Sequence, residues 1–71
     1  MKRIFHLTSG ELAELVGVSK QTVLYYDKVG LLCPKGRMGN RYRYYSLQQA
    51  AELRMILTFR DLGMSIQEIR D

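Results

Sequence analysis

The segment from Gly17 to Gly30 constrains the fold more than any other, because it carries the signals of one short capped helix with a turn before it. Ser19 is placed to accept a hydrogen bond from the first helical turn, as N-cap residues do. Val18 and Val23 have the spacing of a hydrophobic staple around this cap. Gly30 can adopt the left-handed conformation that ends a helix. The segment therefore predicts a helix that begins after Ser19 and ends before Gly30.

The two faces of this predicted helix differ in chemistry. At about 100° per residue, one face gathers side chains that suit a protein core. The other face is polar, basic and aromatic, and no acid lies at its centre, which suits contact with nucleic acid. The core face holds Thr22, Val23, Tyr26 and Val29, and the outer face holds Lys20, Gln21, Leu24, Tyr25 and Lys28.

Further helices are predicted by capping boxes, in which a Ser or Thr and the Glu or Gln three residues later satisfy each other's backbone N–H groups. Gly-Val-Ser then separates the first two helices and predicts a helix-turn-helix, with the second helix in the recognition position. The boxes begin at Thr8, Ser46 and Ser65 and predict helices over about 9–16, about 47–61 and from 66 onward.

Apolar spacing predicts what these helices bury. The helix over 47–61 is apolar on almost every side, so we expect it to be covered on more than one side. One stripe should pack on the first two helices and another on the last one. The helix over 9–16 is expected to bury Leu12, Ala13, Leu15 and Val16.

Residues 31–45 are predicted to form a small β-hairpin, a wing with a basic tip. Two glycines and an asparagine between Gly36 and Asn40 are typical of a turn. The residues that follow alternate between basic and aromatic side chains. Alternation places Arg41, Arg43 and Tyr45 on one face of a strand, and Tyr42 and Tyr44 on the other.

Charge is concentrated in the same region. The chain has 71 residues, enough for one small domain, with 11 Lys and Arg against 7 Asp and Glu, for a net charge of +4. From Lys28 to Ala51 there are five basic residues and no acid, and all five tyrosines lie within 25–45. Basic residues interleaved with aromatic ones are typical of nucleic-acid binding. The alternative is a solvated basic loop.

Other classes of function find little support in the sequence. Cys33 is the only cysteine, so no internal disulfide or thiolate cluster is possible, and a reducing compartment such as the cytoplasm fits. His6 has no acid or cysteine at a useful spacing, so we expect no catalytic residue, no metal site and no cofactor. No apolar run is long enough to span a membrane.

Several motifs, in order and spacing, resemble the MerR family of transcription regulators over the whole chain. Gly-Val-Ser alone is a weak signal. Tyr-Tyr-Asp-Lys-x-Gly-Leu-Leu-x-Pro followed by Tyr-Arg-Tyr-Tyr is a specific one. The matching segments are 8–13, 17–19, 22–34, 43–46 and 62–69.

The resemblance implies a mainly α fold with a small β-hairpin, a winged helix-turn-helix DNA-binding domain over residues 1–71. In the family, a long dimerisation helix and an effector-sensing part follow this domain, and neither is present here. The resemblance implies a homodimer of the full-length protein. That dimer distorts a palindromic promoter operator so that RNA polymerase can engage. The strong start of the helix at 66 and its stop at Asp71 indicate a truncated helix, so we expect this chain alone to be a monomer.

By position, the resemblance also implies contacts with double-stranded DNA. Lys20, Gln21 and Tyr25 correspond to DNA-facing positions of the recognition helix. Arg43 corresponds to the wing arginine, and Arg60 to a basic position near the end of the helix over 47–61. The predicted DNA-binding residues are Ser19, Lys20, Gln21, Leu24, Tyr25, Lys28, Arg37, Arg41, Arg43 and Arg60.

The resemblance has two departures. Ser9 stands where an apolar residue is usual, which costs the first helix some core packing. Leu24 stands where arginine is usual, which puts one phosphate contact in doubt. Tyr26 and Tyr44 look like core aromatics, while the place of Tyr45 stays open.

Two other functions fit a domain of this kind. One is an excisionase-like architectural protein that bends DNA, which a native chain ending near residue 71 would favour. The other is a helical module whose basic face binds an acidic protein. Steep salt dependence of duplex binding would separate DNA binding from the protein-binding module, because DNA binding releases counterions.

Overall fold

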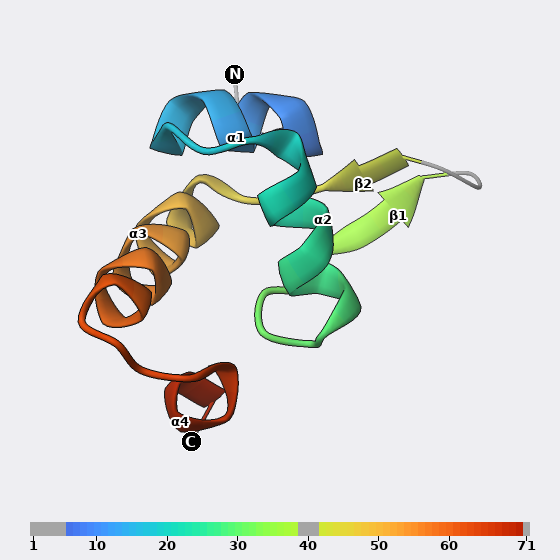
Figure 1. Ribbon diagram of the computed structural model, residues 1–71. Helices are drawn as coiled ribbons and strands as arrows, with labels where there is room; N and C mark the ends of the chain where they lie inside the picture. Colours follow the sequence, from blue (N-terminus) through green and yellow to red (C-terminus); the bar gives the residue numbers. More distant parts are fainter. Residues whose placement is uncertain (1–5, 39–41, 71) are drawn as a thin grey trace.

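The computed structural model describes residues 6–38 and 42–70, so the predicted site residue Arg41 lies outside the described residues. Figure 1 shows α1 and α4 at opposite ends of the molecule, with α2 and α3 between them. No helix in these ranges is long and apolar enough to cross a membrane. In chain order the elements are α1 (Ser9–Val16), α2 (Lys20–Lys28), β1 (Gly36–Met38), β2 (Tyr42–Tyr44), α3 (Leu47–Asp61) and α4 (Ile66–Arg70).

The predicted capping boxes set where three of these helices begin. Before α1, the backbone N–H of Thr8 donates to Glu11 Oε1 at 2.9 Å, and the N–H of Glu11 donates to Thr8 Oγ1 at 3.1 Å. The boxes before α3 and α4 have the same geometry. The Ser19 hydroxyl accepts from the N–H of Thr22 at 3.2 Å before α2. Each side chain satisfies a donor that the helix leaves unpaired, so the predicted helix starts are confirmed.

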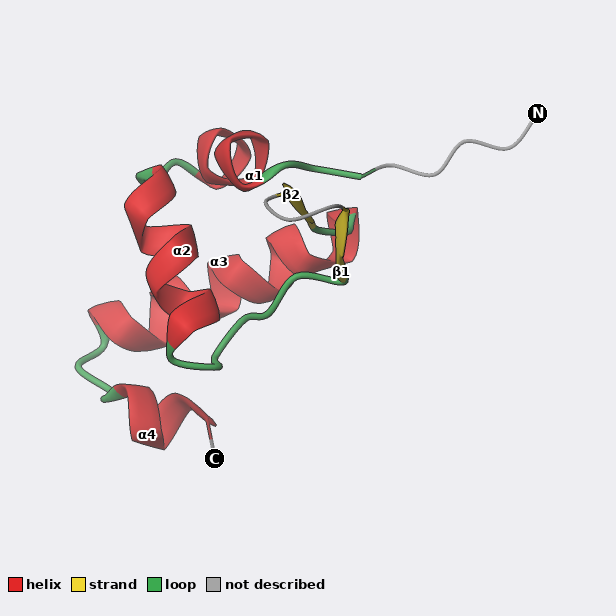
Figure 2. Cartoon of the chain, turned by 90° about the vertical axis from the view of Figure 1, so that its right-hand side faces the viewer, coloured by secondary structure: helices red, strands yellow, loops and turns green. Residues whose placement is uncertain are grey.

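One core joins α1, α2, α3 and the end of the hairpin (Figure 2). Its fully buried side chains come from four separate parts of the chain, which is how such short elements hold together. These side chains are Leu12, Val23, Tyr45 and Leu53.

One expectation about burial is wrong, and another holds only in part. Leu15 is 48% exposed, because it lies about 100° from the centre of the stripe that α1 buries. The helix α3 contacts α1 and α4, as predicted, but it buries a single stripe centred on Leu53 and Ile56, and Met55 is 59% exposed. A chain of this length has too little mass to cover α3 on every side.

The hairpin is confirmed but is shorter than predicted. Its strands are antiparallel, with Arg37 directly opposite Arg43. Residues 31–35 are not part of a strand, because the N–H groups of Leu31 and Leu32 donate to the carbonyl of Tyr26 at 2.9 and 3.1 Å. These bonds hold Leu31 and Leu32 at the end of α2, and the chain first bonds to the other strand at Lys35, whose N–H donates to the carbonyl of Tyr44 at 2.9 Å.

The structure buries a different pair of tyrosines from the pair that the sequence predicted. Tyr26 is buried as expected. Tyr44 is only half-buried and covers Gly36, where an added Cβ would clash with the tyrosine hydroxyl. The ring of His6 stacks on Tyr44 with centroids 4.3 Å apart. The tyrosine that belongs to the core from this end of the hairpin is Tyr45, which is fully buried.

Ser9, the serine that departs from the family pattern, lies beside the ring of Tyr45. Ser9 is buried next to this ring, and the Tyr45 hydroxyl has no hydrogen bond of normal geometry within the described residues. Burial raises the pKa of Tyr45, and the nearby Ser9 side chain offsets only part of that rise. Two small polar groups therefore share an apolar site without a well-formed bond.

We expect the double variant Ser9→Ala, Tyr45→Phe to be as stable as the parent, or up to about 1 kcal/mol more stable. Removing two poorly paired buried polar groups together restores an apolar site of nearly the same shape. Thermal and urea unfolding measure the effect. Leu12→Ala is the matched control and should lose about 2–5 kcal/mol. A loss of more than about 1 kcal/mol in the double variant would mean that the two hydroxyls form a stabilising bond.

Candidate nucleic-acid interface

The outer face of α2, defined by Lys20, Gln21, Leu24, Tyr25 and Lys28, is the first part of the candidate site. The two lysines and Gln21 are exposed, and Tyr25 is 49% exposed. Leu24 is half-buried, so the middle of the face is less open than the sequence predicted. The opposite face supplies Val23 and Tyr26 to the core, which confirms the predicted orientation of the helix.

Different residues lie at the two edges of the outer face of α2. At about 100° per residue, Asp27 lies about 90° from the centre of the outer face, next to Lys20. Gln21 and Tyr25 lie towards the other edge. Tertiary contacts add basic residues at both edges, from the hairpin beside Asp27 and from the end of α3 beside Tyr25.

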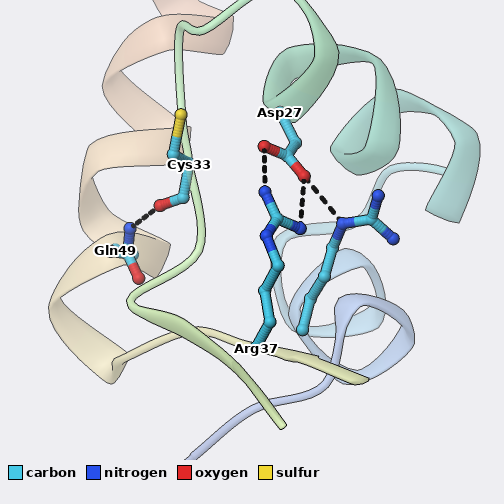
Figure 3. Close-up of polar contacts among 5 residues, drawn as sticks. Asp27, Cys33, Arg37 and Gln49 are labelled. Atoms are coloured by element: carbon cyan, nitrogen blue, oxygen red, sulfur yellow. Dashed lines mark hydrogen bonds and ion pairs between the residues drawn. The ribbon is translucent and has the colours of Figure 1, made fainter. Parts of the chain in front are cut away.

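Asp27 binds Arg37 of β1 and Arg43 of β2. Arg37 donates from Nη1 and Nη2 to the two carboxylate oxygens of Asp27 at 3.2 and 3.3 Å, and Figure 3 shows this fork. Arg43 donates from Nε to Asp27 Oδ2 at 2.7 Å. The carboxylate is only 7% exposed, whereas the side chains of Arg37 and Arg43 are 50% and 34% exposed. One shielded acid therefore holds two partly exposed guanidinium groups.

These contacts change the acidity of the groups involved. Burial alone would raise the pKa of Asp27, but the hydrogen bonds and charges of Arg37 and Arg43 outweigh burial and bring its pKa below the ordinary value. The hydrogen bonds that Arg37 donates to Asp27 raise the pKa of Arg37. Because the pKa of Asp27 is lower in the folded state, the stability from this ion pair is present above the pKa of an unfolded aspartate and is lost as pH falls through the folded pKa.

Arg60 stands at the other edge of the outer face. It lines a groove between α2 and the turn from α3 to α4, together with Gln21 and Tyr25. The nearby Tyr26 hydroxyl, and then Asp61, raise the pKa of Arg60. The contact with Asp61, at 3.3 Å, joins two exposed neighbours in the chain and leaves Arg60 available to another partner.

The structure thus brings together most of the predicted site residues, but in a form that the sequence did not predict. Ser19 is committed to capping α2, although it remains exposed beside the outer face. Asp27 was not among the predicted site residues. The sequence feature that could have indicated Asp27 is its place as the last acid before the acid-free basic segment that begins at Lys28. Helix periodicity also places it at the edge of the outer face.

The structure contains a second polar contact that the sequence did not predict. Gln49, which belongs to the capping box of α3, is buried and donates from Nε2 to the carbonyl of Cys33 at 2.6 Å (Figure 3). This bond ties the segment between α2 and β1 to the start of α3. It therefore helps to place the hairpin relative to the helices.

Known proteins that resemble this chain are transcriptional regulators. The model of the MerR HTH family regulatory protein matches residues 7–71. The chain is 40% identical over 65 residues to the multidrug-efflux transporter 2 regulator of Bacillus subtilis, covering 92% of this chain and 24% of that protein. It is 40% identical over 60 residues to the mercuric resistance operon regulatory protein of Bacillus cereus, covering 84% of this chain and 46% of that protein.

Solved structures give the same result. HiNmlR, a MerR family regulator lacking the sensor domain and bound to promoter DNA, matches with a TM-score of 0.82 and 30% identity, over 93% of this chain and 52% of that one. MtaN, the N-terminus of the Bacillus subtilis multidrug transporter activator, matches with a TM-score of 0.79 and 35% identity, over 89% and 59%. The chain spans only 24% and 46% of the two curated relatives. By its winged helix-turn-helix fold and the match over residues 7–71, the chain belongs to the MerR family of helix-turn-helix regulatory proteins.

Proposed function

We propose that this chain binds double-stranded DNA, with the outer face of α2 in the major groove and the hairpin on the flanking backbone or minor groove. The observation that carries the proposal is the placement of basic side chains on both edges of one exposed helix face. Arg37 and Arg43 stand at one edge, and Arg60 stands at the other. A helix flanked in this way can read base edges while its neighbours hold phosphates.

The relatives support this proposal. HiNmlR is described as bound to promoter DNA, and the chain resembles it over 93% of its length.

The wider role of the domain is also a proposal. We infer that it works in the cytoplasm as part of a longer, dimeric regulator that binds a promoter operator and acts on RNA polymerase indirectly. The length of the curated relatives supports this inference, because the chain spans less than half of each. We propose that residues 1–71 form the DNA-binding domain of this regulator.

Arg43→Ala tests the wing. It should weaken binding to duplex DNA of any sequence and reduce the slope of log K against log salt by about one, because one phosphate contact releases about one counterion. Titrations of a labelled 30-bp duplex at three salt concentrations measure both quantities. Arg54→Ala is the matched control, since Arg54 is an exposed arginine of α3 that contacts the carbonyl of Leu15 instead of the hairpin. Equal effects of the two variants would mean that only the total charge matters.

Leu24→Arg tests the outer face of α2. We expect it to fold with a stability within about 0.5 kcal/mol of the parent, as for most surface substitutions. It should bind DNA of any sequence more tightly and steepen the salt slope by about one. Leu24→Gln controls for polarity without charge. If the arginine variant unfolds, residue 24 belongs to the core. If it folds and binds like the parent, this face does not approach DNA.

The chain on its own should be a monomer that binds a half-site weakly. Its last helix, α4, has five residues, and no heptad pattern is available to pair two copies. Light scattering at micromolar concentration measures the mass in solution. A stable dimer, or nanomolar affinity for a single half-site, would contradict the expectation.

A further inference from the structure

We propose that Asp27 is a positioning residue for DNA binding, which holds Arg37 and Arg43 in the orientation in which they meet phosphate. The inference rests on the proposed function. It concerns an acidic residue inside a basic surface, whose charge by itself would repel DNA. The carboxylate could therefore weaken DNA binding by repulsion, or strengthen it by orienting the two arginines.

The geometry of the arginine N–H donors indicates that Asp27 orients the arginines for DNA binding. Arg43 reaches Asp27 through Nε, so its two terminal nitrogens make no hydrogen bond to the part of the chain that the structure describes. Arg37 uses one N–H from each terminal nitrogen and keeps its Nε–H and the remaining terminal hydrogens. A guanidinium has five N–H donors in a fixed fork. Both arginines can thus hold Asp27 and a phosphate at the same time.

The burial of the three side chains points the same way. The Asp27 carboxylate is 7% exposed, while Arg37 and Arg43 are 50% and 34% exposed. The acid therefore lies beneath the arginines, and the outward side of the cluster is positive. The cluster has two positive charges and one negative charge, so a net positive charge faces solvent.

The register of the hairpin makes such a partner necessary. Arg37 and Arg43 are directly opposite each other on β1 and β2, and like charges in this position repel. Asp27 from α2 accepts hydrogen bonds from both arginines, and its negative charge offsets the repulsion between them. Because the long side chains are ordered before DNA arrives, less conformational entropy is lost on binding. Asp27 also fixes the hairpin against α2, which sets the spacing between the two DNA-contacting parts.

Asp27→Asn is the central variant, since it removes the charge with little change of shape. We expect it to bind a 30-bp mixed-sequence duplex at least fivefold more weakly than the parent, although the protein has become more positive. We also expect a shallower salt slope, because the freed arginines make fewer phosphate contacts. Glu52→Gln is the matched control, an exposed acid of α3 with the same change of charge, and it should bind as the parent does or slightly more tightly.

A variant that lacks both arginines separates positioning from simple repulsion. In the background Arg37→Ala, Arg43→Ala, the change Asp27→Asn should no longer weaken binding and should strengthen it slightly. The carboxylate there is only a negative charge near DNA. This reversal of sign is a coupling between contacting residues, which a double-mutant cycle measures. If Asp27→Asn weakens DNA binding by the same factor in both backgrounds, the proposal is overturned.

A measurement on the parent does not depend on the folding of any variant. The Nε–H signal of Arg43 in nitrogen-resolved NMR should stay protected from solvent exchange when duplex DNA is added, because the bond to Asp27 persists in the complex. Loss of this protection on DNA binding would overturn the proposal, since Asp27 would then release the arginine. Thermal melts of each variant report folding separately.

The outcomes distinguish this inference from the proposed function. If the parent binds duplex DNA with a steep salt slope and Asp27→Asn binds equally well or better, the positioning role fails and DNA binding stands. If the parent itself shows no salt-dependent binding to duplex DNA, the proposed function fails and the positioning role fails with it.

Discussion

The attachment of the hairpin to α2 is the interaction on which the form of this domain depends. A hairpin with three residues in each strand is not stable alone in water. Here the shielded carboxylate of Asp27 binds an arginine from each strand, and Tyr45 anchors the end of the hairpin in the core. Without these contacts, Arg37 and Arg43 would face each other as like charges at the surface. One acidic residue on α2 thus joins both strands of the hairpin to the helix, and Tyr45 holds the end of the hairpin in the core.

The helix α2 serves several purposes with only nine residues. One side supplies Val23 and Tyr26 to the core, the opposite side is exposed and basic, and the edge between them carries Asp27. Capping at Ser19 sets the start of the helix and therefore the direction in which every side chain points. In a small domain the same short helix must stabilise the fold and present the proposed binding surface, because there is no separate scaffold for either task.

The small size of the domain also explains the expectations that were wrong. Leu15 and Met55 follow apolar patterns that are typical of buried positions, yet both are about half exposed or more. A domain of this length buries a smaller share of its surface than a larger one. Within residues 6–38 and 42–70, the fully buried side chains lie where α1, α2, α3 and the end of the hairpin meet. Apolar spacing therefore predicted the helices correctly and overestimated what they bury.

The sequence by itself determined the features that depend on near neighbours in the chain. The capping pairs are three residues apart, and the turn at Gly17 needs only the backbone freedom of glycine, so the helix limits and the outer face of α2 could be predicted. The basic character of Arg37 and Arg43 could also be predicted, but their orientation could not.

Tertiary structure alone decided the contacts between residues distant in the chain. Asp27 meets Arg43 across 16 positions, and Gln49 meets Cys33 across the same separation. Tyr45 takes the core position next to Ser9, while Tyr44 covers Gly36 at the surface. No local propensity encodes these choices. They follow from which surfaces meet when the helices and the hairpin pack around one core.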